Sequence, residues 1–418
     1  MTKVVHIQYY MGASGRTALM LQNAFKGVNV ESDIVSLQTG VQDNPNIKYM
    51  GKIPRLISRI DDRIQAYLTR KSIKQLGSFS YPVLGTNVAK LTEVKNADII
   101  YIHWAWKGFL NFRGLKQIAR LNKPVIFFMH DMWNITGGCH HSFTCEKYKT
   151  VGCNDCPMFP EEKTKDLSFK EFRKKARLYS KYNNLYFIAP SRWLHDCTRE
   201  SLLTKDKPVF CIPNMIDTSL FTPTGKAKAR QILNIDINET VIVFGAVSVT
   251  SPYKGWAYLQ KALELLHNDG SIKNISVLIF GSSYNKEIAE AIPFKTKFMG
   301  YLEDEHSISM VYNAADVFVV PSLADNLPTT ILESLSCGTP VVGFNVGGIP
   351  DMISHKENGY LAKYKDANDV CEGIKFCLQH ALKGYLLPNF TRESTIKKHL
   401  ELFEHIKSDT NIATKSFF

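Results

Sequence analysis

Short hydrophobic runs rich in Val, Ile and Phe alternate along most of the chain with longer segments of helical periodicity. This alternation is typical of parallel α/β units, in which a helix connects each strand to the next. Strands are predicted in two series. The first series is Val4–Tyr10, Asp33–Leu37, Ile99–His103, Val125–Met129 and Leu185–Ala189. The second series is Val241–Val247, Ser276–Phe280, Lys297–Tyr301, Val317–Val320 and Val341–Phe344.

The segment from Cys211 to Pro223 separates the two series and precedes a polar, lysine-rich stretch. We therefore expect two α/β domains, which also suits a length of 418 residues. The expected bounds are 1–213 for an N-terminal Rossmann-like domain, 214–388 for a C-terminal one, and 389–418 for a helix and tail that pack back on the first. Two such sheets are expected to face each other across a cleft, since ligands bind beyond the carboxyl ends of the strands.

The segment from Gly51 to Phe79 follows a different pattern, in which basic and apolar residues alternate at a spacing of three to four. The residues that make the pattern are Arg55, Arg59, Arg63, Arg70, Lys71 and Lys74 with Ile57, Ile60, Ile64, Tyr67, Leu68 and Ile73. This spacing predicts a basic amphipathic helix. Such a helix either lies on an anionic bilayer or packs on the sheet with its basic face in solvent, and the sequence leaves both open.

The composition, 44% hydrophobic and 22% charged, is that of a folded protein and excludes a disordered chain. The start lacks the pattern of a signal peptide and no apolar run of about 18 residues occurs, so we expect a cytoplasmic protein, at most peripheral on the inner face of the membrane. Residues 1–200 hold 30 Lys and Arg against 16 Asp and Glu, whereas residues 201–418 hold 21 against 23. The one-sided charge favours an anionic partner for the N-terminal half, with a merely solvated basic surface as the alternative.

Residues 317–342 have the pattern of a strand, a loop, a helix and a second strand. Pro328 suits the first helical turn and Gly338 the position just past the last, which predicts a helix from about Pro328 to Cys337. The amides around Thr329 and Thr330 would then lack intrahelical partners at the strand ends. That arrangement is a site for a diphosphate.

Two carboxylates accompany this helix start: Asp325 lies in the preceding loop and Glu333 eight residues later. They resemble the acidic-x7-acidic motif of glycosyltransferases with two Rossmann-like domains, the GT-B fold, and in particular the large retaining family 4. The family usually has Glu at the first position, and Asp325 shortens the reach by one methylene. Further segments that look like those of the family, in the expected order, are Ile188–Leu194, Ile212–Asp217, Ala314–Asp316 and Gly347–Asp351.

The resemblance implies a nucleotide-sugar donor site in which Glu333 holds the ribose hydroxyls, Asp325 the sugar hydroxyls and the helix start the diphosphate. The neighbouring donor-binding residues are Asn326, Leu327, Pro328, Thr329 and Thr330. Lys254 matches a diphosphate-binding Lys of the family, with a solvated surface Lys as the alternative. Ser248 occupies the position at which the family has an Arg, and it too is a predicted donor-binding residue. What else offsets the leaving-group charge, a metal or another residue, is left open.

In the N-terminal half, Gly12 and Gly15 follow the first strand and open a helix. Small residues at this position let backbone amides approach a phosphate or sugar. Arg16 is the candidate for a side-chain contact with the phosphate, and an ordinary surface Arg is the alternative. All three are therefore predicted donor-binding residues.

His130 directly follows an apolar strand, at the end that faces the ligand, where the family carries a His near the donor sugar. Asp131 either orients His130 or caps the following turn. His130, Asp325 and Lys254 are thus the candidate catalytic residues. The resemblance implies a reaction without a protein nucleophile, in which the leaving diphosphate helps deprotonate the acceptor on the same face. No catalytic metal is expected.

Four cysteines fall in the loop 136–157 with the spacing Cys-x5-Cys-x7-Cys-x2-Cys, whose last pair is typical of a zinc knuckle. We expect a structural zinc bound by Cys139, Cys145, Cys153 and Cys156, with His140 or His141 as substitutes. Buried free thiols, or a disulfide disfavoured in the cytoplasm, are the alternatives. The insertion is similar to one in a subset of family 4 enzymes associated with cell-surface polysaccharides.

The expected function is that of a retaining glycosyltransferase of the hexosyltransferase type. The donor would be a UDP- or GDP-sugar and the acceptor a glycan or a polyprenyl-diphosphate-linked glycan in surface polysaccharide synthesis. A nucleotide-sugar 2-epimerase of the same fold is the alternative. A basic, zinc-containing nucleic-acid-binding protein is disfavoured, because the basic residues are not interleaved with an aromatic stacking surface. No nucleic-acid partner is expected.

Overall fold

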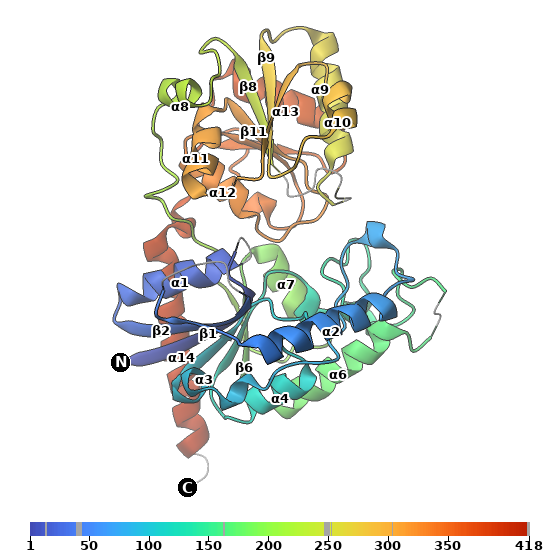
Figure 1. The fold of residues 1–418 in the computed structure, drawn as a ribbon, viewed down its shortest axis with the longest axis vertical. Coiled ribbons are helices and arrows are strands. Elements are labelled where there is room, and N and C mark those ends of the chain that lie inside the picture. The colour runs from blue at the N-terminus through green and yellow to red at the C-terminus, as the bar shows by residue number, and fades with distance from the viewer. Residues whose placement is uncertain are drawn as a thin grey trace. The chain divides into compact units, whose positions relative to one another are not determined.

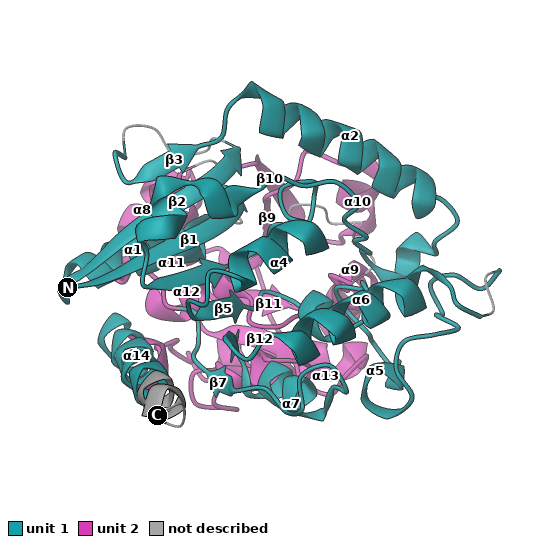
Figure 2. Cartoon of the chain, turned by 90° about the horizontal axis from the view of Figure 1, so that it is seen from below, with its two compact units in different colours: residues 1–214, 392–418 teal, residues 215–391 magenta. Residues whose placement is uncertain are grey.

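The computed structural model describes residues 1–12, 15–38, 44–161, 164–245, 251, 253–302 and 304–415, the last seven of these as backbone only. The chain divides into two compact units (Figures 1 and 2). Unit 1 comprises residues 1–214 and 392–418, and unit 2 comprises residues 215–391. Each unit is built on one sheet.

The sheet of unit 1 has seven parallel strands in the order β3-β2-β1-β4-β5-β6-β7. Their bounds are β1 Thr2–Tyr10, β2 Val30–Gln38, β3 Ile47–Tyr49, β4 Ile99–Ile102, β5 Val125–Phe128, β6 Leu185–Ala189 and β7 Val209–Cys211. Strands β4, β5 and β6 are buried along their whole length because helices cover both faces of the sheet. The strand order reverses between β1 and β4, which is where ligands bind in doubly wound sheets.

Eight α-helices accompany this sheet in the described part of unit 1. They are α1 Arg16–Lys26, α2 Lys52–Leu68, α3 Thr92–Asn96, α4 Phe112–Ala119, α5 Lys147–Thr150, α6 Leu167–Lys181, α7 Arg192–Glu200 and α14 Arg392–Lys415. Helix α14 comes from the C-terminal end of the chain. Its Arg392 donates to the backbone oxygen of Asn23 at 3.0 Å, and its Phe403 ring packs 5.6 Å from that of Phe25.

The sheet of unit 2 has six parallel strands in the order β10-β9-β8-β11-β12-β13. Their bounds are β8 Thr240–Gly245, β9 Ile275–Phe280, β10 Lys295–Gly300, β11 Val317–Val320, β12 Val341–Phe344 and β13 Gly359–Ala362. Its helices are α8 Lys226–Ile232, α9 Trp256–Asp269, α10 Lys286–Ala291, α11 Glu305–Ala314, α12 Thr329–Ser336 and α13 Ala367–Gln379. The predicted fold class, two Rossmann-like parallel sheets, is confirmed.

All ten predicted strands have a counterpart, but β3, β7 and β13 were not predicted. These three strands are only three or four residues long and lie at or beside a sheet edge, so they carry little hydrophobic pattern. The helix predicted over residues 51–79 ends at Leu68, so Arg70, Lys71 and Lys74 lie beyond it. Pro328 is the residue before α12 and not part of its first turn, because its ψ of 111° is extended.

Candidate functional site

The carboxyl ends of β8, β11 and β12 lie side by side in unit 2, and the loops that follow them converge. The backbone amide of Leu323 donates to the backbone oxygen of Tyr253 at 2.7 Å, which ties the loop after β11 to the loop before α9. Gly255 makes this approach possible. Its φ is +69°, and a Cβ placed there would lie 1.8 Å from the backbone oxygen of Pro321.

Lys254 and Asp325 meet at this junction. The Lys254 Nζ lies 2.8 Å from the Asp325 Oδ2, and their side chains are 29% and 18% exposed. Burial alone would lower the pKa of the Lys254 ammonium, but the charge and hydrogen bond of Asp325 outweigh burial and raise it. Lys254 is therefore a partly buried cation at neutral pH. Two of the three predicted catalytic residues are in contact.

The loop after β12 fixes Asp325 from the other side. The amide of Gly348 donates to the backbone oxygen of Asp325 at 3.2 Å. Gly347 has a φ of +58°, and a Cβ there would lie 2.0 Å from the same oxygen. The two glycines that open the family-like segment Gly347–Asp351 thus have a structural reason. They allow the β12 loop to reach the Asp325 backbone.

Helix α12 begins directly beside this pair. Thr329 and Thr330, both half-buried, open the helix, and their amides lack intrahelical acceptors at this position. Asn326 and Leu327 are buried, at 3% and 5% exposed. The helix start can receive an anionic ligand next to the Lys254 ammonium.

Glu333 lies on the second turn of α12 and is 4% exposed. Its Oε2 accepts a hydrogen bond of 3.2 Å from the Tyr312 hydroxyl. The carboxylate is thus more buried than that of Asp325. Its predicted contact with ribose hydroxyls stays a prediction, and Tyr312 is a partner that the sequence did not indicate.

In unit 1, Gly12 and Gly15 lie in the turn between β1 and α1, with the Gly15 amide donating to the Gly12 oxygen at 2.8 Å. A Cβ on Gly15 would lie 2.5 Å from the backbone oxygen of Tyr10, so the turn requires glycine there. Arg16 is the first residue of α1. Ser248, the remaining predicted donor-binding residue, lies outside the described residues.

His130 follows β5 and ends a chain of three imidazoles. Its Nε2 lies 3.1 Å from the Nδ1 of His103, whose Nε2 lies 3.0 Å from the Nδ1 of His6. His6 and His103 are buried in β1 and directly after β4. Neither histidine was predicted as part of the site, although each is a polar residue within a predicted apolar strand.

Burial keeps these histidines neutral. It lowers the pKa of His6 to about 3, that of His130 to about 4, and that of His103 well below its ordinary value. Each neutral imidazole carries one proton, so both bonds of the chain must run in the same direction. The tautomer of His103 therefore fixes whether the Nε2 of His130 donates or accepts.

Asp131 does not bind His130 in this network. Its Oδ2 lies 2.6 Å from the Nδ1 of His140, and its Oδ1 accepts from the Trp133 amide at 2.7 Å. Of the two predicted roles, the turn cap is the one observed. His140 also contacts Ser80, 2.8 Å from its Nε2, so both ring nitrogens are engaged and His140 is not a substitute zinc ligand as the structure stands.

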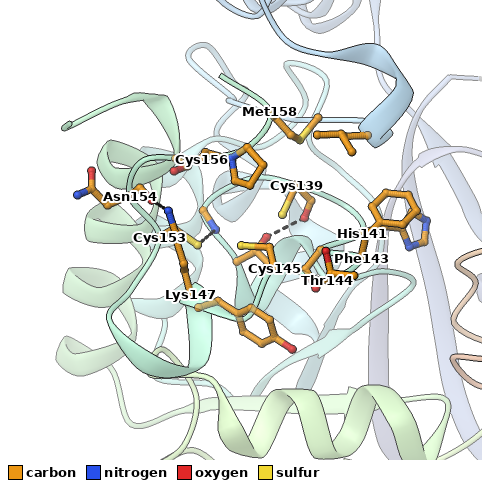
Figure 3. A pocket seen from close by; sticks show the side chains of 17 residues that line it. Cys139, His141, Phe143, Thr144, Cys145, Lys147, Cys153, Asn154, Cys156 and Met158 are labelled. Carbon is orange, nitrogen blue, oxygen red and sulfur yellow. Dashed lines mark hydrogen bonds between the residues drawn. The ribbon is translucent and has the colours of Figure 1, made fainter. Parts of the chain in front are cut away.

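The four cysteines of the loop 136–157 line one cavity of about 80 Å³ (Figure 3). Cys139, Cys145, Cys153 and Cys156 reach it from separate turns of the loop, and His141 lines it too. All nine cysteines of the chain are free thiols. Burial raises the pKa of Cys139 to about 12 and that of Cys156 to about 11, so these thiols are protonated at neutral pH.

The cysteines gather, but they do not form a coordination shell. Within the described ranges, no three His, Cys, Asp or Glu side chains are arranged closely enough to hold a metal ion. The Sγ of Cys153 instead accepts a hydrogen bond of 3.0 Å from the Gly137 amide. Four cysteine thiols are ligands that zinc commonly binds, but here they are not arranged around one point as zinc ligands would be. The zinc site therefore stays a prediction.

A buried lysine supports the start of this loop. Lys175, fully buried on α6, donates to the backbone oxygens of Trp133 and Thr136 and lies 3.5 Å from the centre of the Trp133 ring. Glu171, one turn earlier, is equally buried. Neither residue was predicted from the sequence, although a Glu and a Lys four residues apart on a helix are a recognisable signal.

Comparison with known proteins finds a match for the segment of unit 2 that contains these residues. Residues 238–380, which include Lys254, Asp325 and Glu333, match the family model described as Glycosyl transferases group 1. The alpha-maltose-1-phosphate synthase of Mycobacterium tuberculosis (strain CDC 1551 / Oshkosh) is 30% identical over 198 residues, which are 44% of this chain and 49% of that protein. The first relatives are each matched over 34% to 49% of their own length.

Solved structures match nearly the whole chain. The sucrose-phosphate synthase of Thermosynechococcus elongatus has a TM-score of 0.60 at 15% identity, covering 98% of this chain and 100% of that one. Anabaena Alr3699/HepE in complex with UDP and glucose has a TM-score of 0.59 at 16% identity, with the same coverage. The chain therefore has the GT-B fold, and residues 238–380 of its unit 2 match the glycosyltransferase group 1 model.

Proposed function

We propose that this protein is a retaining family 4 glycosyltransferase that moves a sugar from a UDP- or GDP-sugar to a glycan or polyprenyl-diphosphate-linked acceptor. The observation that carries this proposal is the ion pair of Lys254 and Asp325 at the start of α12. The pair joins a cation for a diphosphate to a carboxylate for sugar hydroxyls, within the segment that matches the family model.

The chemistry assigned to the site is stabilisation of charge. When the bond between the sugar C1 and the diphosphate oxygen breaks, the diphosphate gains negative charge, which Lys254 and the amides of Thr329 and Thr330 offset. The acceptor oxygen forms its bond to C1 on the same face, and its proton passes to the departing diphosphate oxygen. Asp325 accepts hydrogen bonds from sugar hydroxyls and so orients the ring.

His130 is proposed to contact the donor sugar as a neutral imidazole, because burial holds its pKa at about 4. In one direction of the histidine chain, the Nδ1 of His103 donates to the Nε2 of His130, and the single proton of the His130 ring then lies on its Nδ1. In this role His130 positions the sugar and transfers no proton.

Several observations support the choice of donor and place of action. One structural relative, Alr3699/HepE, was solved with UDP and glucose, which favours a nucleotide sugar. Within the described residues, no helix has the length and apolar character needed to cross a membrane. We propose that the enzyme works in the cytoplasm, at the inner face of the cell membrane, in surface polysaccharide synthesis.

The test is a screen of UDP- and GDP-sugars by thermal shift, followed by product analysis with free and lipid-linked glycan acceptors. We expect one nucleotide class to raise the melting temperature and its sugar to be transferred with retention at C1. Asp325→Asn should abolish transfer, whereas the exposed carboxylate variant Glu290→Gln should keep it. Release of a free sugar epimer without transfer would favour a nucleotide-sugar 2-epimerase instead.

A further inference from the structure

Helix α2 is attached to unit 1 through its polar face. Ser58, Asp61 and Gln65 are the buried residues of this helix, at 2%, 0% and 7% exposed. The hydroxyl of Ser58 donates to the backbone oxygen of Lys107 at 2.6 Å. An amphipathic helix on a protein surface usually buries its apolar residues, so this orientation is reversed.

The polar contacts of α2 are specific. Asp61 accepts from the amides of Val83 and Leu84 at 2.9 and 2.7 Å. Gln65 donates to the backbone oxygen of Trp106 at 2.9 Å and accepts from the amide of Tyr81 at 2.8 Å. Because each buried polar group has a partner, the helix cannot roll its apolar face inward without leaving these groups unpaired.

A glycine fixes the same orientation. Gly108 has a φ of +66°, and a Cβ there would lie 2.6 Å from the Ser58 Cα and 2.7 Å from the Asp61 Cβ. The backbone of α2 therefore lies directly on the chain at Gly108. Only small or polar residues fit at this contact, which leaves the apolar residues on the opposite side.

The outward side of α2 carries a row of large apolar side chains. Ile53, Leu56, Ile60 and Tyr67 are 73%, 57%, 42% and 64% exposed. Their spacing of three, four and seven residues places them on one face of the helix. Figure 2 shows α2 at the rim of unit 1. A continuous exposed apolar row on an ordered helix marks an interaction surface.

Cations flank this row. Lys52, Arg59, Arg63 and Arg70 are exposed, and Arg70 lies over the Tyr67 ring at 3.9 Å. Of the two acidic residues on the helix, Asp61 is buried and Asp62 lies 3.9 Å from Lys107. The exposed face of α2 thus combines apolar side chains with an excess of positive charge.

We propose that this face of α2 docks on an anionic lipid bilayer. The four apolar side chains would enter the interface between headgroups and acyl chains, while the arginines and lysine extend to lipid phosphates. A second copy of the chain is a poorer partner, because pairing two such faces would bring like charges together. This surface is separate in sequence and structure from Lys254 and Asp325, so it does not rest on the proposed reaction.

The test measures binding of the full chain to vesicles of phosphatidylcholine with and without 30% phosphatidylglycerol, by co-sedimentation at low and high salt. Wild-type protein should bind the anionic vesicles and release them at high salt. Arg59→Gln with Arg63→Gln should weaken binding about thirtyfold, since each cation near such a surface contributes about fivefold. Ile53→Ser with Leu56→Ser should weaken it by removing the apolar contribution without any change in charge.

A charge-matched control is Arg199→Gln with Lys205→Gln, two exposed cations at and just after α7, on the opposite side of unit 1 from α2 (Figure 2). This variant should bind as tightly as wild type, and all variants should keep the wild-type melting temperature. If the control loses as much vesicle affinity as the α2 variants, binding depends only on the net charge of the protein. That result would overturn the proposal that α2 is the docking surface. Wild-type protein that binds no vesicles, or that dimerises through α2 in light scattering, would overturn it too.

Discussion

The Lys254 ammonium lies 2.8 Å from the Asp325 carboxylate although 71 residues separate them in the chain. Without a ligand each charge is balanced by the other in a partly buried site, which avoids the cost of an isolated buried charge. A diphosphate and a sugar would offer each of them a new partner. The ion pair is a structural contact, and in the proposed reaction it would also serve as a preformed binding site.

Replacing Lys254 with Ala should lower turnover more than it lowers donor affinity. The diphosphate carries more charge once the glycosidic bond has broken, so the ammonium stabilises the transition state more than the bound donor. We expect turnover to fall by about 10² to 10³, which is typical for removal of one charge-stabilising donor. Steady-state kinetics and nucleotide titration separate the two effects. Lys254→Arg, which keeps the charge, is the control; equal losses in both quantities would assign Lys254 to anchoring alone.

Replacing Glu333 with Ala should weaken nucleotide binding by about 1.5 to 3 kcal/mol, because charge-assisted hydrogen bonds to the ribose would be lost. Isothermal titration with the cognate nucleoside diphosphate measures this loss. Tyr312→Phe is the matched control, since it removes the 3.2 Å hydrogen bond to Glu333 and keeps the carboxylate. If both variants bind the nucleotide as wild type does, Glu333 is a structural partner of Tyr312 and not a ribose ligand.

The stability of unit 1 should fall as the pH drops below about 6.5. His6, His130 and His399 have pKa values lowered by burial to about 3, 4 and 3, and His103 is lowered strongly as well. In the unfolded chain they take up protons near pH 6.5, whereas the folded chain does not until about pH 4. Their contribution is therefore complete above pH 6.5 and is lost progressively as the pH falls from 6.5 to about 3, the lowest of these folded-state pKa values.

Urea unfolding followed by tryptophan fluorescence measures this effect, since Trp104, Trp106, Trp133 and Trp193 lie in unit 1 and only Trp256 in unit 2. Each buried histidine should add about 1.4 kcal/mol per pH unit to the slope of unfolding free energy against pH. His399→Phe should reduce that slope. Ile396→Val, a buried neighbour on α14, should lower stability and keep the slope; an unchanged slope in His399→Phe would contradict the prediction.

The sequence predicts the sheets well because strands covered on both faces are continuously apolar, as Val317–Val320 and Val341–Phe344 show. The family resemblance assigns Lys254 and Asp325 to one donor site, but their 2.8 Å contact is seen only in the structure. The sequence cannot predict the histidine chain, since His6, His103 and His130 come from three strands whose order only the folded sheet defines. The sequence also cannot predict which face of α2 packs on unit 1, because an amphipathic pattern allows either face to be buried. The polar face is the buried one because its side chains bind the backbone of Val83, Leu84 and Trp106.

Protein purified without chelator should contain about one zinc per chain, bound by the four cysteines that surround the cavity in the loop 136–157. As free thiols, Cys139 and Cys156 have pKa values raised by burial to about 12 and 11, so they are protonated at neutral pH. Zinc binds thiolates, and its uptake by the apoprotein should therefore release up to about four protons per chain. A pH indicator in weak buffer measures this release during titration with zinc.

Cys153→Ser should lower both zinc content and melting temperature, because three thiolates and a hydroxyl hold zinc more weakly and the loop loses its cross-link. Serine keeps an oxygen to accept the hydrogen bond from the Gly137 amide, so loss of that bond does not confound the result. Cys211→Ser, on β7 and outside the loop, is the matched control and should keep the zinc. Wild-type protein that is free of zinc, takes up none and releases no protons would establish the four residues as buried thiols that only pack the loop.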